Sequence, residues 1–180
     1  MTKRYDPDIH HRRSVRLQTH DYARRAASFV TICSHEREYL FGGVLGDVMR
    51  PNVLGRAVIE CWEALPAHFC GVTYDAFIVM PNHVHAILVL GDVAAPADDA
   101  KAQPAAPLSP SLGSIIGSFK SAAARSVNRL RFSPAAPVWQ RNYYEHIVRN
   151  ESELACIRRY VTGNPASWRE DEYYVPIRVP

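Results

Sequence analysis

The sequence predicts an α+β fold in which an antiparallel sheet carries helices on one face. Segments rich in β-branched and aromatic residues alternate with two segments whose apolar residues recur at helical spacing, in the order β-α-β-β-α-β. A third helical segment follows the last of these strands. This order is that of the ferredoxin-like fold, and 180 residues suffice for one such domain but not for two domains of ordinary size.

The first strand is predicted at residues 26–34 (AASFVTICS), where β-branched and aromatic residues dominate. A glycine-rich loop is expected next, at residues 41–46 (FGGVLG). The helix that follows has Asn52 as its N-cap and Pro66 near its end. Its apolar stripe consists of Leu54, Ala57, Val58, Cys61, Trp62 and Leu65.

Two short apolar runs, at residues 74–80 and 83–90, predict a β-hairpin, because Pro81-Asn82 between them is a turn signal. Residues 91–110 consist mostly of alanine, proline and aspartate. We expect them to form a flexible insertion at the surface.

The second amphipathic helix is predicted at residues 111–131. Its inward-facing residues are Leu112, Ile115, Ile116, Phe119, Ala123, Val127 and Leu130, and its solvent-facing residues are Lys120, Arg125, Arg129 and Arg131. Residues 138–148 (VWQRNYYEHIV) predict a fourth strand or an extended aromatic segment. A third helix begins at Asn150, which fits a capping box with Glu153. It ends near Pro165, because proline disfavours helical geometry at the residue before it.

The net charge of +3 is distributed unevenly along the chain. Residues 1–25 carry seven basic and three acidic side chains (net +4), residues 26–110 four and nine (net −5), and residues 111–160 eight and three (net +5). Two basic segments around an acidic one suggest a surface that binds polyanions, although arginines on exposed helix faces give the same count. The predicted organisation is a basic arm at 1–25, a single catalytic domain at 26–168 and a tail at 169–180.

The composition also excludes some classes of protein. No run of 18 apolar residues occurs, which excludes a transmembrane helix. The N-terminus lacks the apolar segment of a secretory signal, so we expect a cytoplasmic protein with no membrane partner. The four cysteines form no Cys-x-x-Cys pair, which leaves a zinc ribbon or a thioredoxin-like site without support.

His83 and His85 are the first candidate site residues. Side chains alternate along a strand, so the two imidazoles share one face while Val84 points to the other. Two imidazoles on a rigid strand supply half of a divalent-metal site. The alternative is a pair of partly exposed surface histidines with no ligand.

Tyr160 and Asn164 are the second candidate pair. Their spacing of i, i+4 places a phenol and a carboxamide on one face of the third helix. The carboxamide oxygen can complete the coordination of a metal while the phenol faces the group that the metal polarises. Alternatively, Tyr160 extends the apolar stripe of this helix and Asn164 only caps it.

Three blocks of this sequence resemble one family. Residues 80–90 (MPNHVHAILVL) resemble the His-hydrophobic-His motif of the HUH single-tyrosine transposases. Residues 138–150 (VWQRNYYEHIVRN) and 157–165 (IRRYVTGNP) resemble the downstream blocks of one branch, the transposases associated with repetitive extragenic palindromes (REP). The blocks occur in the family's order, and the resemblance extends over residues 12–168. It implies the ferredoxin-like core that the order of elements also predicts.

The resemblance implies a metal-dependent reaction. His83 and His85 would bind Mg²⁺ or Mn²⁺ with Asn164 as the third protein ligand, and Tyr160 would be the nucleophile. Attack on single-stranded DNA next to a hairpin would give a 5′-phosphotyrosine and a free 3′-hydroxyl, which permits rejoining. We expect a monomer in which Tyr160 acts in cis and which needs no protein partner, although some relatives are dimers with shared sites.

Further residues are candidates for DNA contacts, because cations and aromatic rings suit phosphates and unpaired bases. They are Arg12, Arg13, Arg16, Lys120, Arg125, Arg141, Tyr143, His146 and Arg149. The alternatives are a solvated N-terminal arm and aromatic side chains that enter the core.

Two other functions compete with DNA nicking and rejoining. A catalytically silent hairpin DNA- or RNA-binding module of the same fold would keep the surface and lose the chemistry; the central strands lack the aromatic signature of RNA-binding sheets. A metal-dependent phosphodiesterase that uses activated water would not need Tyr160.

Overall fold

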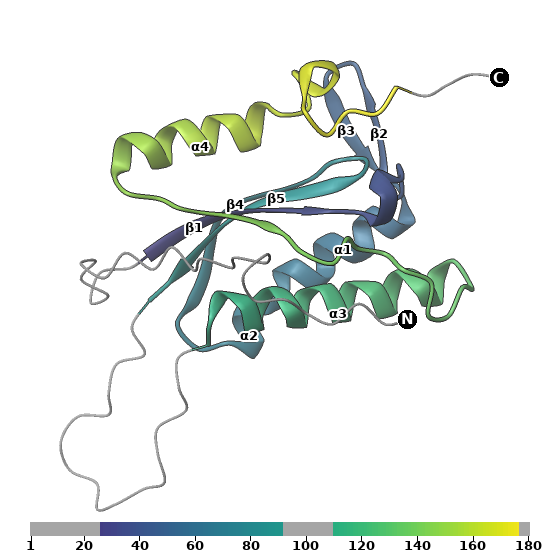
Figure 1. The fold of residues 1–180 in the computed structure, drawn as a ribbon, viewed down its shortest axis with the longest axis horizontal. Coiled ribbons are helices and arrows are strands. Elements are labelled where there is room, and N and C mark those ends of the chain that lie inside the picture. Colours follow the sequence, from purple (N-terminus) through teal and green to yellow (C-terminus); the bar gives the residue numbers. More distant parts are fainter. Residues whose placement is uncertain (1–25, 92–109, 177–180) are drawn as a thin grey trace, which may run out of the picture.

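A four-stranded antiparallel sheet forms the centre of the protein in the computed structural model, which describes residues 26–91 and 110–176 (Figure 1). Its strands lie in the order β4-β5-β1-β6. They are β1 (Ala26–Cys33), β4 (Val72–Val79), β5 (His83–Leu90) and β6 (Tyr144–Ile147). The predicted α+β class with an antiparallel sheet is confirmed. The basic arm at 1–25 and most of the insertion at 91–110 lie outside the described residues.

Helices cover both faces of the sheet (Figure 1). One face carries α1 (Val53–Glu63) and α3 (Leu112–Leu130), with the short α2 (Leu65–His68) beside them. The other face carries α4 (Glu151–Gly163). Short 3₁₀ turns are η1 (His35–Arg37) and η2 (Trp168–Glu170). Among the described helices, none combines the length and the apolar character needed to cross a bilayer.

The alternation of side chains along β5 decides where the histidines lie. Val84, Ala86 and Leu88 belong to the main core under α1 and α3. Ile87 belongs to a smaller cluster with Leu154 and Val161 of α4, so His83 and His85 lie on the α4 face as well. In the register of the sheet, Cys33 pairs with His83 and Thr31 with His85.

The predicted loop at residues 41–46 is wrong. Gly42–Leu45 and Val48–Pro51 form strands β2 and β3 of a separate two-stranded sheet. Both residues of the connecting turn, Gly46 and Asp47, have positive φ (56° and 60°), which is the conformation of a two-residue hairpin turn. Strands β2 and β3 are therefore inserted into the predicted order, between the first strand and the first helix.

The segment around α3 differs from the prediction in three places. Leu130 is 38% exposed and does not enter the core. Lys120 is half-buried, and its Nζ donates to the carbonyl oxygens of Gln140 (2.6 Å), Arg141 (3.4 Å) and Asn142 (3.3 Å). This lysine therefore holds the chain between α3 and β6. The last strand is shorter than predicted, because only residues 144–147 of the segment 138–148 pair as β6.

Side chains before and within its first turn fix the start of α4. Asn150 is the N-cap, and its side chain accepts a hydrogen bond from the Glu153 N–H (2.9 Å), as predicted. The reciprocal bond of the capping box differs, because the Glu153 carboxylate accepts from the Arg149 N–H (2.6 Å) and from His146 Nε2 (2.8 Å). At the other end, Asn164 keeps helical dihedrals (φ −56°, ψ −39°) despite Pro165 after it, contrary to the expectation.

Two helical glycines predict stability changes of opposite sign. A Cβ at Gly55 would lie 2.1 Å from the Phe41 carbonyl oxygen, whereas one at Gly117 would have no neighbour within 4 Å. We expect Gly55→Ala to destabilise by about 1–3 kcal/mol through this overlap. We expect Gly117→Ala to stabilise by about 0.5–1 kcal/mol, because alanine favours helix. Urea unfolding of both variants measures this, and a stabilised Gly55→Ala protein would contradict the close approach of α1 to Phe41.

Candidate metal and nucleophile site

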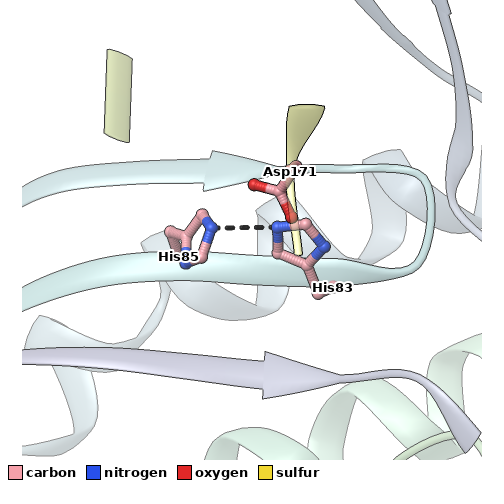
Figure 2. A group of neighbouring side chains, drawn as sticks. All are labelled: His83, His85 and Asp171. Carbon is pink, nitrogen blue, oxygen red and sulfur yellow. Dashed lines mark hydrogen bonds between the residues drawn. The ribbon is translucent and has the colours of Figure 1, made fainter. Parts of the chain in front are cut away.

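His83 and His85 face each other in the protein interior. Both are fully buried, and their Nε2 atoms lie 2.9 Å apart (Figure 2). Asp171 completes a group whose ligand atoms all lie within 4.8 Å of one another. The predicted pairing of the two imidazoles on one face is therefore observed, but the histidines are not partly exposed surface residues.

The tautomer of His83 follows from Asn82. The Asn82 Nδ2 amide donates to the carbonyl oxygens of Arg37 (3.2 Å) and Tyr173 (2.8 Å), which fixes the orientation of the carboxamide. Its Oδ1 therefore faces His83 Nδ1 (2.9 Å) and accepts a hydrogen bond from an Nδ1–H group. His83 Nε2 is left with a free lone pair directed at His85.

His85 has a similar support on its other side. Its Nδ1 lies 2.8 Å from the Thr31 hydroxyl, which stands opposite on β1. When Nδ1 donates to this hydroxyl, the Nε2 atoms of both imidazoles present lone pairs to each other. A cation between them satisfies both lone pairs at once. Oriented Nδ1–H groups are also the usual support of histidines that bind metal through Nε2.

Burial keeps both imidazoles neutral. It lowers the pKa of His83 to about 2, with a further contribution from His85, and lowers the pKa of His85 to about 4 against an opposing effect of Asp171. Neutral imidazole is the form that binds a metal. The pair is therefore ready to bind at neutral pH.

Tyr160 brings a phenol to this group. Its hydroxyl lies 3.2 Å from His85 Nε2 and donates to the Asp171 carboxylate at 3.4 Å. The side chain is 43% exposed, and its ring packs edge-on against Phe29 of the cluster under α4 while its hydroxyl lies at His85. Burial raises the pKa of the phenol well above its usual value, and the Asp171 charge raises it further. Without a cation beside it, this phenol stays protonated.

Asn164 lies at the same site, one helical turn after Tyr160. Its Nδ2 donates to the Asp171 carboxylate (2.6 Å), and its Oδ1 is buried without a hydrogen-bond partner among the described residues. Two imidazoles and a carboxylate, with an unpaired buried amide oxygen on the residue that donates to that carboxylate, are a donor set that suits a divalent cation such as Mg²⁺ or Mn²⁺. The residues therefore fit a metal.

Asp171 is the residue that the sequence did not predict. Its carboxylate accepts hydrogen bonds from Asn164 Nδ2 (2.6 Å) and from the Tyr173 N–H (2.7 Å). It lies in the segment expected to be a tail, within an acidic run (Glu170-Asp171-Glu172) that has no metal-binding spacing. No local pattern distinguishes it, because only the tertiary fold brings it to β5.

A cavity of about 270 Å³ lies beside the nucleophile candidate. Tyr160, Asn164 and Asp171 line it, together with Arg159 and Glu170. The cavity gives a substrate group access to the exposed part of the phenol.

The predicted DNA-contacting residues are dispersed. Arg141 and Arg149 are exposed between α3 and α4, and Arg125 is exposed on α3, across the sheet from the histidines. Lys120 is occupied by carbonyl oxygens, and His146 is bonded to Glu153. Tyr143 packs against the main core. The residues Arg12, Arg13 and Arg16 lie outside the described part of the chain.

Comparison with solved structures finds two transposases. The structure of a REP-associated tyrosine transposase bound to a REP hairpin superposes with a TM-score of 0.49 at 18% identity, over 83% of this chain and 72% of that one. A protein of Deinococcus radiodurans R1, provisionally identified as a transposase, gives a TM-score of 0.47 at 16% identity, over 79% of this chain and 93% of that one. Likenesses at this level do not establish the activity of the chain.

Comparison of sequences gives a clearer relationship. No family model matches the chain. A Haemophilus influenzae protein (strain ATCC 51907 / DSM 11121 / KW20 / Rd), described as an uncharacterized protein, is 39% identical over 181 residues, which cover 97% of this chain and 99% of that protein. The chain therefore belongs to the same protein family as this Haemophilus influenzae protein.

Proposed function

We propose that this protein is an HUH single-tyrosine transposase of the REP-associated branch, which nicks and rejoins single-stranded DNA at hairpin-flanked sites. The observation that carries the proposal is the position of the Tyr160 hydroxyl, 3.2 Å from His85 Nε2 within the His83, His85 and Asp171 cluster. A phenol, two neutral imidazoles and a carboxylate converge there although they come from separate parts of the chain. Two of the three sequence blocks that resemble the family contain these candidates: residues 80–90 hold His83 and His85, and residues 157–165 hold Tyr160 and Asn164.

The ligands of a divalent cation, Mg²⁺ or Mn²⁺, would be His83, His85 and Asp171, with the unpaired Oδ1 of Asn164 as a further donor. Such a cation supplies positive charge that neutralises a scissile phosphate and stabilises a phenolate. Asn82 and Thr31 hold the two imidazoles in the orientation that this binding requires.

Tyr160 performs the covalent step. Its oxygen attacks the phosphorus of a DNA phosphodiester, the bond from phosphorus to the 3′-oxygen breaks, and the 5′ end stays attached as a phosphotyrosine. The phenolic proton leaves along the hydrogen bond to Asp171, and the released 3′-oxygen takes up a proton from solvent. The new phosphodiester to tyrosine conserves the bond energy, so a 3′-hydroxyl can reverse the step without ATP.

The contact between Tyr160 and His85 lies within one chain. This supports a monomer in which the tyrosine acts in cis, since no second copy is needed to complete the site. The substrate we propose is a DNA hairpin with an unpaired flank, in which the single strand reaches the cavity beside Tyr160.

Replacement of the nucleophile tests the proposal directly. With a hairpin DNA labelled at its 3′ end and Mn²⁺ present, we expect the wild type to give a labelled protein adduct on a denaturing gel. Tyr160→Phe should abolish both the adduct and the nick, because phenylalanine has no oxygen to attack phosphorus. Tyr74→Phe, at another part-exposed tyrosine, is the matched control and should retain activity.

Two results would contradict this mechanism. Cleavage that survives Tyr160→Phe would indicate hydrolysis by water. Binding without cleavage, across hairpins taken from the DNA that flanks the gene, would indicate a silent binding module.

Metal binding tests the ligand set. We expect His83→Ala and Asp171→Asn each to weaken Mn²⁺ binding about tenfold or more, measured by the EPR signal of free Mn²⁺. His68→Ala is the control, because this histidine is exposed on α2, which lies on the other face of the sheet. Unchanged affinity in Asp171→Asn would remove the carboxylate from the proposed ligands.

The pH dependence of Mn²⁺ binding follows from the imidazoles. Protons compete with a metal only near or below the pKa of a ligand, and these pKa values are lowered to about 2 (His83) and about 4 (His85). We therefore expect the affinity of these imidazoles for Mn²⁺ to stay nearly constant from about pH 7 down to about pH 5. An ordinary pair of histidines, with a pKa of about 6.5, would lose affinity for Mn²⁺ over the same range. An affinity that falls steeply below about pH 6.5 would show that the imidazoles are more solvated than in this structure.

A further inference from the structure

Phe132 is the most exposed large apolar side chain of the described residues, at 90%. It directly follows α3 and has a positive φ of 53°, in the left-handed region that a bulky residue rarely adopts. Ala135, three residues later, also has a positive φ (64°). Packing does not account for this conformation, because the ring contributes almost nothing to the core.

The loop that presents Phe132 is held by hydrogen bonds on both sides of it. Asn128 Oδ1 accepts from Arg131 Nε (2.9 Å), and Asn128 Nδ2 donates to the Ala136 carbonyl oxygen (2.9 Å). The Arg131 guanidinium also donates to the Pro137 carbonyl oxygen (3.1 Å). The Ser133 N–H donates to the Asn128 carbonyl oxygen (3.0 Å). The Ser133 bond closes a left-handed C-terminal cap of α3, which accounts for the positive φ of Phe132 and leaves its side chain outside the core.

Two cations stand beside this ring. Arg125 and Arg129 are spaced i, i+4, which places them on one face of α3 near its end. Phe132 follows the C-cap Arg131 and lies against the same groove. They line a groove of about 570 Å³ together with Asn128 and Pro134, and none of the lining residues is acidic. Within residues 26–91 and 110–176, the guanidinium groups of Arg125 and Arg129 make no hydrogen bond or ion pair. The groove therefore combines an aromatic side chain with two cations that have no counter-ion among the described residues.

The groove lies near the same end of the sheet as the proposed active site. After the Phe132 loop, the chain reaches Trp139, which bridges to Ser34, and the Gln140 N–H donates to the Cys33 carbonyl oxygen. Cys33 pairs with His83 in the sheet. Since α3 and α4 cover opposite faces, the groove and Tyr160 are on opposite sides of this end (Figure 1).

We propose that the Phe132 groove is a second DNA-binding surface, in which an unpaired base stacks on Phe132 and its flanking phosphates bind Arg125 and Arg129. This inference rests on the proposed function, and it adds a contact that positions the hairpin while its flank reaches Tyr160. Nucleic acid fits the groove better than an apolar protein segment, because two uncompensated guanidinium groups flank a single aromatic ring.

The test is hairpin binding by the full chain, measured by fluorescence anisotropy. We expect Phe132→Ser to weaken binding of a hairpin with unpaired bases by about 5- to 100-fold, the range for loss of one stacked base. It should leave a fully paired duplex unaffected. Leu45→Ser is the matched control, since Leu45 is 71% exposed on the β2–β3 hairpin without this basic groove, and should bind like the wild type. Both side chains are too exposed for the core to depend on them.

Two further readouts separate stacking from charge. A 2-aminopurine at the unpaired position should be quenched on binding to the wild type and not on binding to Phe132→Ser. The double variant Arg125→Gln, Arg129→Gln should reduce the slope of log affinity against log salt by about 1.4, which corresponds to two phosphate contacts on a single strand.

Equal affinity of Phe132→Ser and Leu45→Ser for the hairpin would overturn the inference, even if the wild type nicks DNA through Tyr160. So would a dimer in sedimentation that Phe132→Ser abolishes while DNA binding stays intact, because the groove would then hold a second copy. Tighter binding of RNA than DNA, lost in Phe132→Ser, would also overturn it. If the wild type binds the hairpin through Phe132 but does not nick it, the proposed reaction is wrong and the proposed DNA-binding surface is supported.

Discussion

The burial of two imidazoles with their Nε2 atoms 2.9 Å apart is the constraint on which the rest of the site depends. A cation between the two Nε2 atoms would satisfy a lone pair on each ring when both rings carry their proton on Nδ1. Asn82 in the turn before β5 and Thr31 on the neighbouring strand satisfy the Nδ1 atoms. The register of β1 against β5 is thus a condition for the chemistry as well as for the fold.

The position of the phenol depends on how α4 is anchored. At its start, the Asn150 side chain accepts from the Glu153 N–H, and the Glu153 carboxylate accepts from the Arg149 N–H just before the helix. In its middle, Arg158 pairs with Asp75 of β4 (2.7 Å), which holds the pKa of this carboxyl below its usual value. Leu154 and Val161 pack on the sheet beside Ile87. These contacts fix α4 against the strands that carry the histidines, and Tyr160 contacts His85 there.

The parts of this architecture that follow local periodicity could be predicted from the sequence. Alternation along a strand placed His83 and His85 on one face, and the i, i+4 spacing placed Tyr160 and Asn164 together. Asp171 could not be predicted, because it approaches β5 only through the tertiary path of residues 164–171. The β2–β3 hairpin was missed since its glycines are equally typical of a loop. Lys120 was wrongly predicted to face solvent. Helical periodicity shows only that its side chain points away from the core, and not that it binds carbonyl oxygens of a later segment.

The raised pKa of Tyr160 has a consequence for control of the reaction. Burial and the Asp171 carboxylate both oppose the phenolate, so the group that would act as nucleophile is least reactive when no cation is near. The same carboxylate is a candidate ligand, and binding a cation would remove its negative charge from the phenol. The Asp171 carboxylate, which without a cation disfavours the phenolate of Tyr160, would then help to hold the cation that stabilises this phenolate. Reactivity at Tyr160 would therefore depend on occupation of the site by a cation.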